Sequence, residues 1–303
     1  MSVDLKKIGT ENRNPNTMDI DACSTQEILV KINNEDKTVP YAVEKAIPQI
    51  APLVDKVYES FKKGGRLIYM GAGTSGRVGV LDAVECRPTY GVSDDMVQCL
   101  MAGGNKAFVK AVEGAEDSKT MPVDDLNAIH INANDVVVGI AASGRTPYVV
   151  AGVEYAKSVG AATGCITTSP NSILASKVDF PVEAITGAEP ITGSTRMKSG
   201  TAQKLICNMI STAAMIKMGK VYQNLMIDLQ ATNEKLVRRS QSILEQATGC
   251  TTEEAAQAIA KFGGVKKALF SLLTGEQDNA LIEATLDKVQ GNIREALASY
   301  LKK

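Results

Sequence analysis

The glycine-rich turn at residues 71–76 constrains the fold of this chain more than any other stretch. An apolar run at residues 67–70 precedes the turn, and a helical pattern follows it as far as Pro88. Glycine permits positive φ and lets a ligand approach the main chain. Free N–H groups in the helix's first turn favour an anion there, and Thr74 and Ser75 add hydroxyl donors. The stretch predicts the first half of a βαβ unit with a phosphate or phosphosugar site at the turn.

Two nucleotide-binding motifs match this turn only in part. Gly71, Gly73 and Gly76 have the spacing of the dinucleotide fingerprint, but the next apolar run, 97–101, leads into glycines without the acidic residue that binds ribose. A P-loop requires a lysine after its second glycine, whereas Arg77 follows Gly76. Neither motif is complete. The alternative to an anion site is an ordinary tight turn between a strand and a helix.

Composition narrows the class of protein. A chain of 303 residues can form one large or two ordinary domains with a substantial core. The formal net charge is −1 and basic residues form no run, which argues against nucleic-acid binding. No apolar run is long enough to span a bilayer, so no membrane association is expected. Scattered cysteines without CxxC spacing indicate reduced thiols in a cytoplasmic protein: Cys23, Cys86, Cys99, Cys165, Cys207 and Cys250.

Histidine is almost absent from the sequence. His130 is the only one, so the chain lacks the material for a histidine-built zinc site or a Ser-His-Asp triad. This scarcity shifts any acid–base chemistry in this chain towards carboxylates.

Strands and helices alternate through the first two thirds of the chain. The run at 136–140 is continuously apolar, which is typical of a strand covered on both faces. Helical patterns separate the apolar runs, and this alternation predicts an α/β fold with a mostly parallel sheet. The expected strands are residues 67–70, 97–101, 136–140, 161–167 and 180–184.

A second turn with exposed hydroxyls follows the strand at 136–140. Residues 141–147 contain Ser143 and Thr146, with Pro147 suited to the first helical position and Thr146 to the cap. Ligands of parallel sheets bind beyond the carboxyl ends of the strands. Two hydroxyl-bearing turns at strand ends therefore indicate one anion site.

Helices are expected on both sides of this region. Residues 1–20 predict an extended arm, and Ser24 to Glu27 has capping-box spacing that opens a helix through about residue 33. Residues 36–63 predict a longer helix that prolines kink or split. A short helix is expected at 171–177.

The last third of the chain is helical in pattern. Helices are expected from 193 to about 218, from 224 to about 247, and then as a small module of three helices, 252–261, 265–273 and 278–300 with a break near Gly291. The predicted domains are residues 1–245 and 246–303. Ser194 is a candidate cap of the first of these helices. Arg196 and Lys198 place positive charge at a helix start, which opposes the dipole and suggests a role toward substrate anions; a solvated surface is the alternative.

Several motifs, in order, resemble those of the bacterial N-acetylmuramic acid 6-phosphate etherases, members of the sugar isomerase (SIS) superfamily of phosphosugar-binding domains. The resemblance covers nearly the whole chain. It implies a three-layer α-β-α sandwich with a mostly parallel five-stranded sheet, followed by a C-terminal module similar to ubiquitin-associated three-helix folds. The motifs are GAGTSGR at 71–77, DAVEC at 82–86, VEGAEDS at 112–118, ASGRTPY at 142–148 and GSTRMKSGTAQK at 193–204.

The resemblance also implies an activity and a site. These etherases cleave the C3 lactyl ether of their substrate, giving N-acetylglucosamine 6-phosphate and D-lactate in the recycling or catabolism of cell-wall amino sugars. Elimination and hydration need an acid and a base, which the family pattern places at Glu85, expected to protonate lactate, and at Glu116, expected to handle the C2 proton. The expected substrate-binding residues are Ser75, Ser143, Thr146, Thr74, Gly76, Ser194, Arg196 and Lys198. The resemblance implies no metal and no organic cofactor. A homodimer is expected, since SIS relatives commonly dimerise.

Other interpretations stay open at this point. Glu113, Glu116 and Asp117 can be read as a solvated acidic turn, and Glu85 as a surface residue at the end of a helix that Cys-Arg-Pro closes. A phosphosugar-binding regulator would share the pocket without turnover. An aldose–ketose isomerase would abstract the same C2 proton without expelling a group from C3.

Overall fold

The computed structural model describes residues 9–110, 112–229 and 233–301, which form two compact units. The first unit contains the residues up to Val84 and Asp94–Ser211, and the second contains Glu85–Ser93 and the residues from Thr212 onward. Two helices, α3 (Gly73–Tyr90) and α7 (Lys198–Lys217), each continue from one unit into the other. The domain boundary expected at 245/246 stays a prediction.

A five-stranded sheet forms the centre of the first unit, and all of its neighbouring strands are parallel. The strand order is β2-β1-β3-β4-β5. Gly71 at the end of β1 pairs with Met101 on one side and Ile140 on the other, so three strands end at the same edge. The five predicted strands are confirmed as β1 (Leu67–Gly71), β2 (Val97–Met101), β3 (Val136–Ile140), β4 (Ala162–Thr167) and β5 (Phe180–Glu183).

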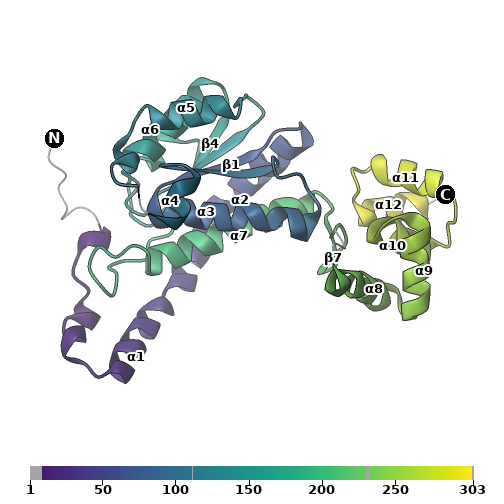
Figure 1. Cartoon of the computed structure of the whole chain (residues 1–303), viewed down its shortest axis with the longest axis horizontal. Coiled ribbons are helices and arrows are strands. Elements are labelled where there is room, and N and C mark those ends of the chain that lie inside the picture. The colour runs from purple at the N-terminus through teal and green to yellow at the C-terminus, as the bar shows by residue number, and fades with distance from the viewer. Residues whose placement is uncertain (1–8, 111, 230–232, 302–303) are drawn as a thin grey trace. The chain divides into compact units, whose positions relative to one another are not determined.

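Helices cover both faces of this sheet, which gives the expected three layers (Figure 1). On one face α6 (Pro147–Ser158) lies so close to β1 that a methyl group at Gly152 would lie 2.6 Å from Met70 Cε. On the other face α3 lies equally close to β2, because a methyl group at Gly79 would lie 2.7 Å from Cys99 Sγ. The helices α5 (Met121–Ala128) and α2 (Val39–Lys62) complete the two helical layers. Apolar side chains alternate between the two faces as the strand period requires.

The N-terminal segment departs from the predicted extended arm. Its described part forms three short 3₁₀ turns, Gly9–Glu11, Pro15–Thr17 and Ile20–Ala22; residues 1–8 lie outside the described residues. The capping box at Ser24 is present and begins α1 (Thr25–Asp36). The prolines do not split α2, which runs as one helix. Short turns α4 (Asn105–Val109), η5 (Ala115–Asp117) and η6 (Ala175–Lys177) complete this unit, so the helix predicted at 171–177 is reduced to one turn.

The second unit is helical, with one small hairpin. The helix predicted from residue 224 starts only at α8 (Glu234–Thr248), because β6 (Val221–Tyr222) and β7 (Leu225–Met226) pair through a turn at Gln223, where φ is 56°. Two of the three predicted module helices are α9 (Thr252–Phe262) and α10 (Val265–Thr274). The third is two helices, α11 (Asn279–Asp287) and α12 (Ile293–Tyr300), separated near Gly291 as the glycine predicted. One apolar cluster holds α8 to α12 together.

Candidate active site

The first hydroxyl-bearing turn is part of a helix, not a loop before one. The helix α3 begins at Gly73, three residues earlier than predicted, so Thr74, Ser75 and Gly76 occupy its first turn. Gly73 has φ of +53°, a conformation that glycine adopts without strain. The N–H groups of Thr74 and Ser75, which have no partner within the helix, therefore lie directly after the end of β1, while the Gly76 N–H donates to Ala72 O at 3.3 Å. This arrangement favours an anion at the sheet's edge.

The second turn leaves two hydroxyls free for a ligand. Thr146 is the cap residue of α6 and Pro147 its first residue, as predicted. The half-exposed side chains of Ser143 and Thr146 have no hydrogen-bond partner among the described residues. Gly144 shapes the turn: its φ is +61°, and a methyl group there would lie 2.3 Å from Ser172 Cβ. Because β1 and β3 are neighbours, both turns lie at the same edge of the sheet.

A buried polar network that the sequence did not reveal supports both turns. The Ser75 hydroxyl donates to Gln203 Oε1 at 3.0 Å, and Gln203 Nε2 is buried without a partner in the described structure. Behind the second turn, Thr168 Oγ1 lies 2.9 Å from Ser199 Oγ, which donates to Glu189 Oε1 at 2.7 Å. The only signal of this network in the sequence is the run at 193–204, where polar residues recur within a predicted helix.

The Glu189 carboxylate caps α7, which corrects the prediction that Ser194 does so. Its oxygens accept from the backbone N–H groups of Lys198 at 2.8 Å and Ser199 at 2.9 Å. A carboxylate nine residues upstream satisfies the first-turn donors and suits the helix dipole better than a hydroxyl does. Ser194 lies outside the helix and is half-exposed.

The two cations predicted near this helix start have different environments. Arg196 is exposed, whereas Lys198 is buried and its Nζ lies 2.7 Å from Glu35 Oε2. Asn16 also donates to Glu35, at 2.8 Å. Burial raises the pKa of the Glu35 carboxyl, but these hydrogen bonds together outweigh burial and hold it below its ordinary value of 4.5. The Lys198 ammonium thus joins α1 to α7, and its role toward substrate stays a prediction.

Glu116 lines a cavity at the carboxyl ends of β1 and β2. The cavity holds about 220 Å³, and Gly73, Arg77, Glu113 and Gly114 are also on its wall. Glu116 lies in η5, whose preceding Gly114 has φ of +74°. Both glutamates are exposed, while Asp117 does not line the cavity. The cavity therefore combines a helix N-terminus, one guanidinium and two carboxylates, all in the first unit.

Glu85 is an exposed residue of α3 and belongs to the second unit. The prediction that the helix ends at Cys-Arg-Pro is wrong, since α3 continues through Pro88 to Tyr90. Proline removes one hydrogen bond within a helix, but the Gly91 N–H still donates to Arg87 O at 2.9 Å and completes the last turn. The convergence of Glu85 and Glu116 on one substrate stays a prediction.

Asp82, which the sequence did not single out for a role, is a buried carboxylate one turn before Glu85. It accepts from Asn208 Nδ2 at 2.6 Å and from Ser211 and Tyr69 hydroxyls at 3.0 Å each. Burial raises the pKa of Asp82, and these donors only partly offset that effect. The side chain fixes the rotation of α3 against β1 and α7.

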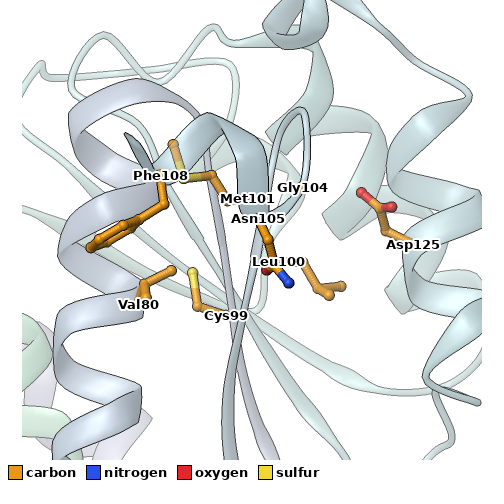
Figure 2. Close-up of a pocket in the computed structure, with 8 residues that line it drawn as sticks. All are labelled: Val80, Cys99, Leu100, Met101, Gly104, Asn105, Phe108 and Asp125. Carbon is orange, nitrogen blue, oxygen red and sulfur yellow. The ribbon is translucent and has the colours of Figure 1, made fainter. Parts of the chain in front are cut away.

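A larger cavity, of about 320 Å³, lies between α3 and α5 along β2 (Figure 2). Figure 2 shows Val80, Cys99 and Phe108 on its wall, with Asp125 at the opposite side. Burial raises the pKa of Cys99 to about 12, so its thiol stays neutral. Asp125 accepts from the Tyr148 hydroxyl at 2.6 Å. An apolar wall with its one carboxylate already engaged is a poor site for a phosphate.

Three further properties concern the described residues only. Within ranges 9–110, 112–229 and 233–301, no three His, Cys, Asp or Glu side chains gather as metal ligands. In the same residues, no helix combines the length and apolarity that a bilayer crossing needs. All six cysteines are free thiols.

Comparison with known proteins gives one consistent result. Residues 49–157 match the N-terminal SIS domain of glucokinase regulatory protein, 107–213 the SIS domain, and 223–267 the C-terminal lid domain of glucokinase regulatory protein. N-acetylmuramic acid 6-phosphate etherase of Vibrio atlanticus is 53% identical over 97% of this chain and 96% of its own. Those of Enterobacter sp. and Clostridium beijerinckii are each 52% identical, over 97% and 98% of this chain and 99% and 97% of their own.

Proposed function

This chain belongs to the family of N-acetylmuramic acid 6-phosphate etherases, and we propose that it performs the family's reaction with two carboxylates and a serine- and threonine-lined phosphate site. The enzyme is a carbon–oxygen lyase. It cleaves the C3 lactyl ether of N-acetylmuramic acid 6-phosphate and gives N-acetylglucosamine 6-phosphate and D-lactate, a step in the catabolism of cell-wall amino sugars. A sequence identity of 53% over nearly the full length of the chain carries this assignment.

The reaction is an elimination followed by a hydration. In the open-chain sugar the C1 aldehyde acidifies the C2–H bond. Glu116 removes this proton, the C2–C3 double bond forms, and the C3–O bond breaks as Glu85 protonates the departing lactate oxygen. Water then adds to C3 of the unsaturated aldehyde, and a proton returns to C2. The position of Glu116 on the wall of a cavity beside the α3 N-terminus supports its role as the base.

The phosphate is bound by the two turns at the sheet's edge. Ser75, Ser143 and Thr146 supply hydroxyls, and Thr74 in the first turn of α3 supplies a backbone N–H group. Gly76, whose N–H donates to Ala72 O at 3.3 Å, is a proposed contact through the rest of its main chain. The unpartnered hydroxyls of Ser143 and Thr146, and the unpartnered donor of Gln203 next to Ser75, support a ligand acceptor here. Ser194, Arg196 and Lys198 are further proposed contacts.

One assay tests the activity against its alternatives. The protein is incubated with N-acetylmuramic acid 6-phosphate, and D-lactate is measured. We expect stoichiometric D-lactate and N-acetylglucosamine 6-phosphate. A regulator would bind the sugar without product, and an isomerase would yield a ketose without lactate; either result would contradict the assignment.

We propose that the enzyme is a cytoplasmic homodimer. Free thiols at all six cysteines support a reducing compartment. On α1 the side chains of Leu29 and Val30 are 61% and 50% exposed, which supports burial against a second copy. Analytical ultracentrifugation tests the dimer, and a monomeric mass at micromolar concentration would contradict it.

A further inference from the structure

Arg77 is the only cation on the wall of the 220 Å³ cavity that holds Glu116, among the residues described there. It lies on α3, one turn after Gly73, and is half-buried. Its Nε donates to Phe108 O and its Nη2 to Ala107 O, both at 2.9 Å. The proposed phosphate-binding hydroxyls do not involve this side chain.

The guanidinium keeps part of its hydrogen-bonding capacity for a ligand. Arginine carries five N–H donors, and the two contacts with α4 use two of them. Glu113 and Glu116 line the same cavity, yet neither forms an ion pair with Arg77 in the described structure. The two carbonyl contacts fix the orientation of the guanidinium plane. An oriented, charged donor without a counterion on a cavity wall suits an anion, and a planar carboxylate best of all.

The substrate carries such an anion besides its phosphate. The lactyl group is attached through oxygen to C3, so its carboxylate is two bonds beyond the ether oxygen and close to C2. If Glu116 handles the C2 proton, the group on C3 lies within the same cavity. Resting on the proposed function, we propose that Arg77 binds the D-lactyl carboxylate and so distinguishes the substrate from the same sugar phosphate without that group.

A second interpretation gives Arg77 a structural role only. Its two hydrogen bonds go to carbonyl groups of α4, a helix of five residues. Removing these bonds would disturb the cavity wall as a whole. Such damage would weaken every ligand of the cavity alike. If Arg77 bound the phosphate instead, its removal would also weaken the binding of both sugar phosphates alike. The carboxylate assignment alone predicts a loss that depends on the lactyl group.

The test compares three variants, each with two ligands. Glu116→Gln serves as background so that N-acetylmuramic acid 6-phosphate stays intact, and calorimetry measures its dissociation constant and that of N-acetylglucosamine 6-phosphate. In Arg77→Met we expect the affinity for N-acetylmuramic acid 6-phosphate to fall by about 10- to 100-fold, the range of a charged hydrogen-bonded pair. The affinity for N-acetylglucosamine 6-phosphate should fall by less than about twofold. Arg77→Lys should lie between, because lysine keeps the charge without the fork. Lys106→Met removes an exposed charge of α4 that is not on the cavity wall and should change neither constant.

A measurement without any change at Arg77 covers the case in which Arg77→Met does not fold. The Glu116→Gln chain should bind the lactyl carboxamide of the substrate about 10-fold or more weakly than the carboxylate. Equal affinities, or equal losses for both sugar phosphates in Arg77→Met, would overturn the inference. D-lactate release by the unaltered enzyme separates this failure from that of the proposed function: with release intact only Arg77's role is lost, and without release both are.

Discussion

Glu116 and Asp117 are adjacent, exposed carboxylates, but only Glu116 lines the cavity beside the α3 N-terminus. The sequence predicted carboxylate chemistry because His130 is the single histidine. It could not rank neighbouring acids by composition, and the family resemblance supplied that ranking. Neither could it find Gln203, Glu189 or Asp82, since a buried polar side chain has partners that only the fold brings together.

Glu116→Gln should reduce D-lactate release by about 10²- to 10⁴-fold, the usual contribution of a general base. Binding of the sugar phosphate should persist, because the amide keeps the size of the side chain. Asp117→Asn is the matched control, with the same change one residue away, and should keep turnover. We expect Glu85→Gln to behave like Glu116→Gln. Turnover at the unaltered rate in either glutamine variant would disprove that residue's role.

At the scale of elements, strands were predicted better than helix ends. Five apolar runs became the five strands, and the pattern is strongest in β1 and β3, which are buried along their whole length. The start of α3 at Gly73, and the hairpin at 221–226 that overlaps the start of a predicted helix, depend on turns for which the apolar period carries no signal. The cap of α7 comes from Glu189, outside the helix, and no local motif reveals it.

Gly144→Ala should damage the second phosphate turn. Alanine at φ +61° is strained by about 1–2 kcal/mol, and its methyl group also overlaps Ser172. We expect a lower melting temperature and weaker binding of the substrate in the Glu116→Gln background. Gly249→Ala, at φ +76° with open space around it, bears the strain alone. If both variants bind substrate equally well, the turn's geometry is not needed for the phosphate.

The Glu35–Lys198 ion pair makes a pH-dependent contribution to stability. Because the pKa of Glu35 in the folded chain is below 4.5, the contribution is complete above that pH and is lost as pH falls through the folded value. At pH 7, Glu35→Gln should lower the free energy of unfolding by about 3 kcal/mol, since Lys198 stays buried without a counterion. The difference from the unaltered chain should shrink below pH 4.5.

Denaturant unfolding at several pH values measures that difference. Glu44→Gln, on the exposed face of α2, is the control and should change stability little at any pH. A Glu35→Gln effect of constant size from pH 7 to below the titration of carboxyl groups would contradict the linkage.

For the whole molecule, the α/β class and the helical C-terminal part follow from the sequence, whereas the compact units do not. Periodicity reveals elements but not which of them share a core. Ile243 and Leu244 of α8 are 3% and 0% exposed and belong to one apolar cluster with Leu269 and Phe270 of α10. This packing ties α8 to the C-terminal helices.

A pair of fragments tests where the C-terminal folding unit begins. Residues 220–303 should melt cooperatively and at a higher temperature than 246–303, which lacks α8. Burial of each large aliphatic side chain contributes about 1.5–3 kcal/mol, so the loss of Ile243 and Leu244 should be plain in thermal circular dichroism. Equal melting temperatures would instead support a boundary at 245/246.

The central claim, that elimination breaks the C3–O bond and water then adds at C3, is tested most directly by turnover in oxygen-18 water. Mass spectrometry of both products locates the label. We predict one oxygen-18 atom at the C3 hydroxyl of N-acetylglucosamine 6-phosphate and none in D-lactate. Label in the lactate, with an unlabelled sugar, would mean that the other carbon–oxygen bond of the ether is cut, and it would contradict the mechanism.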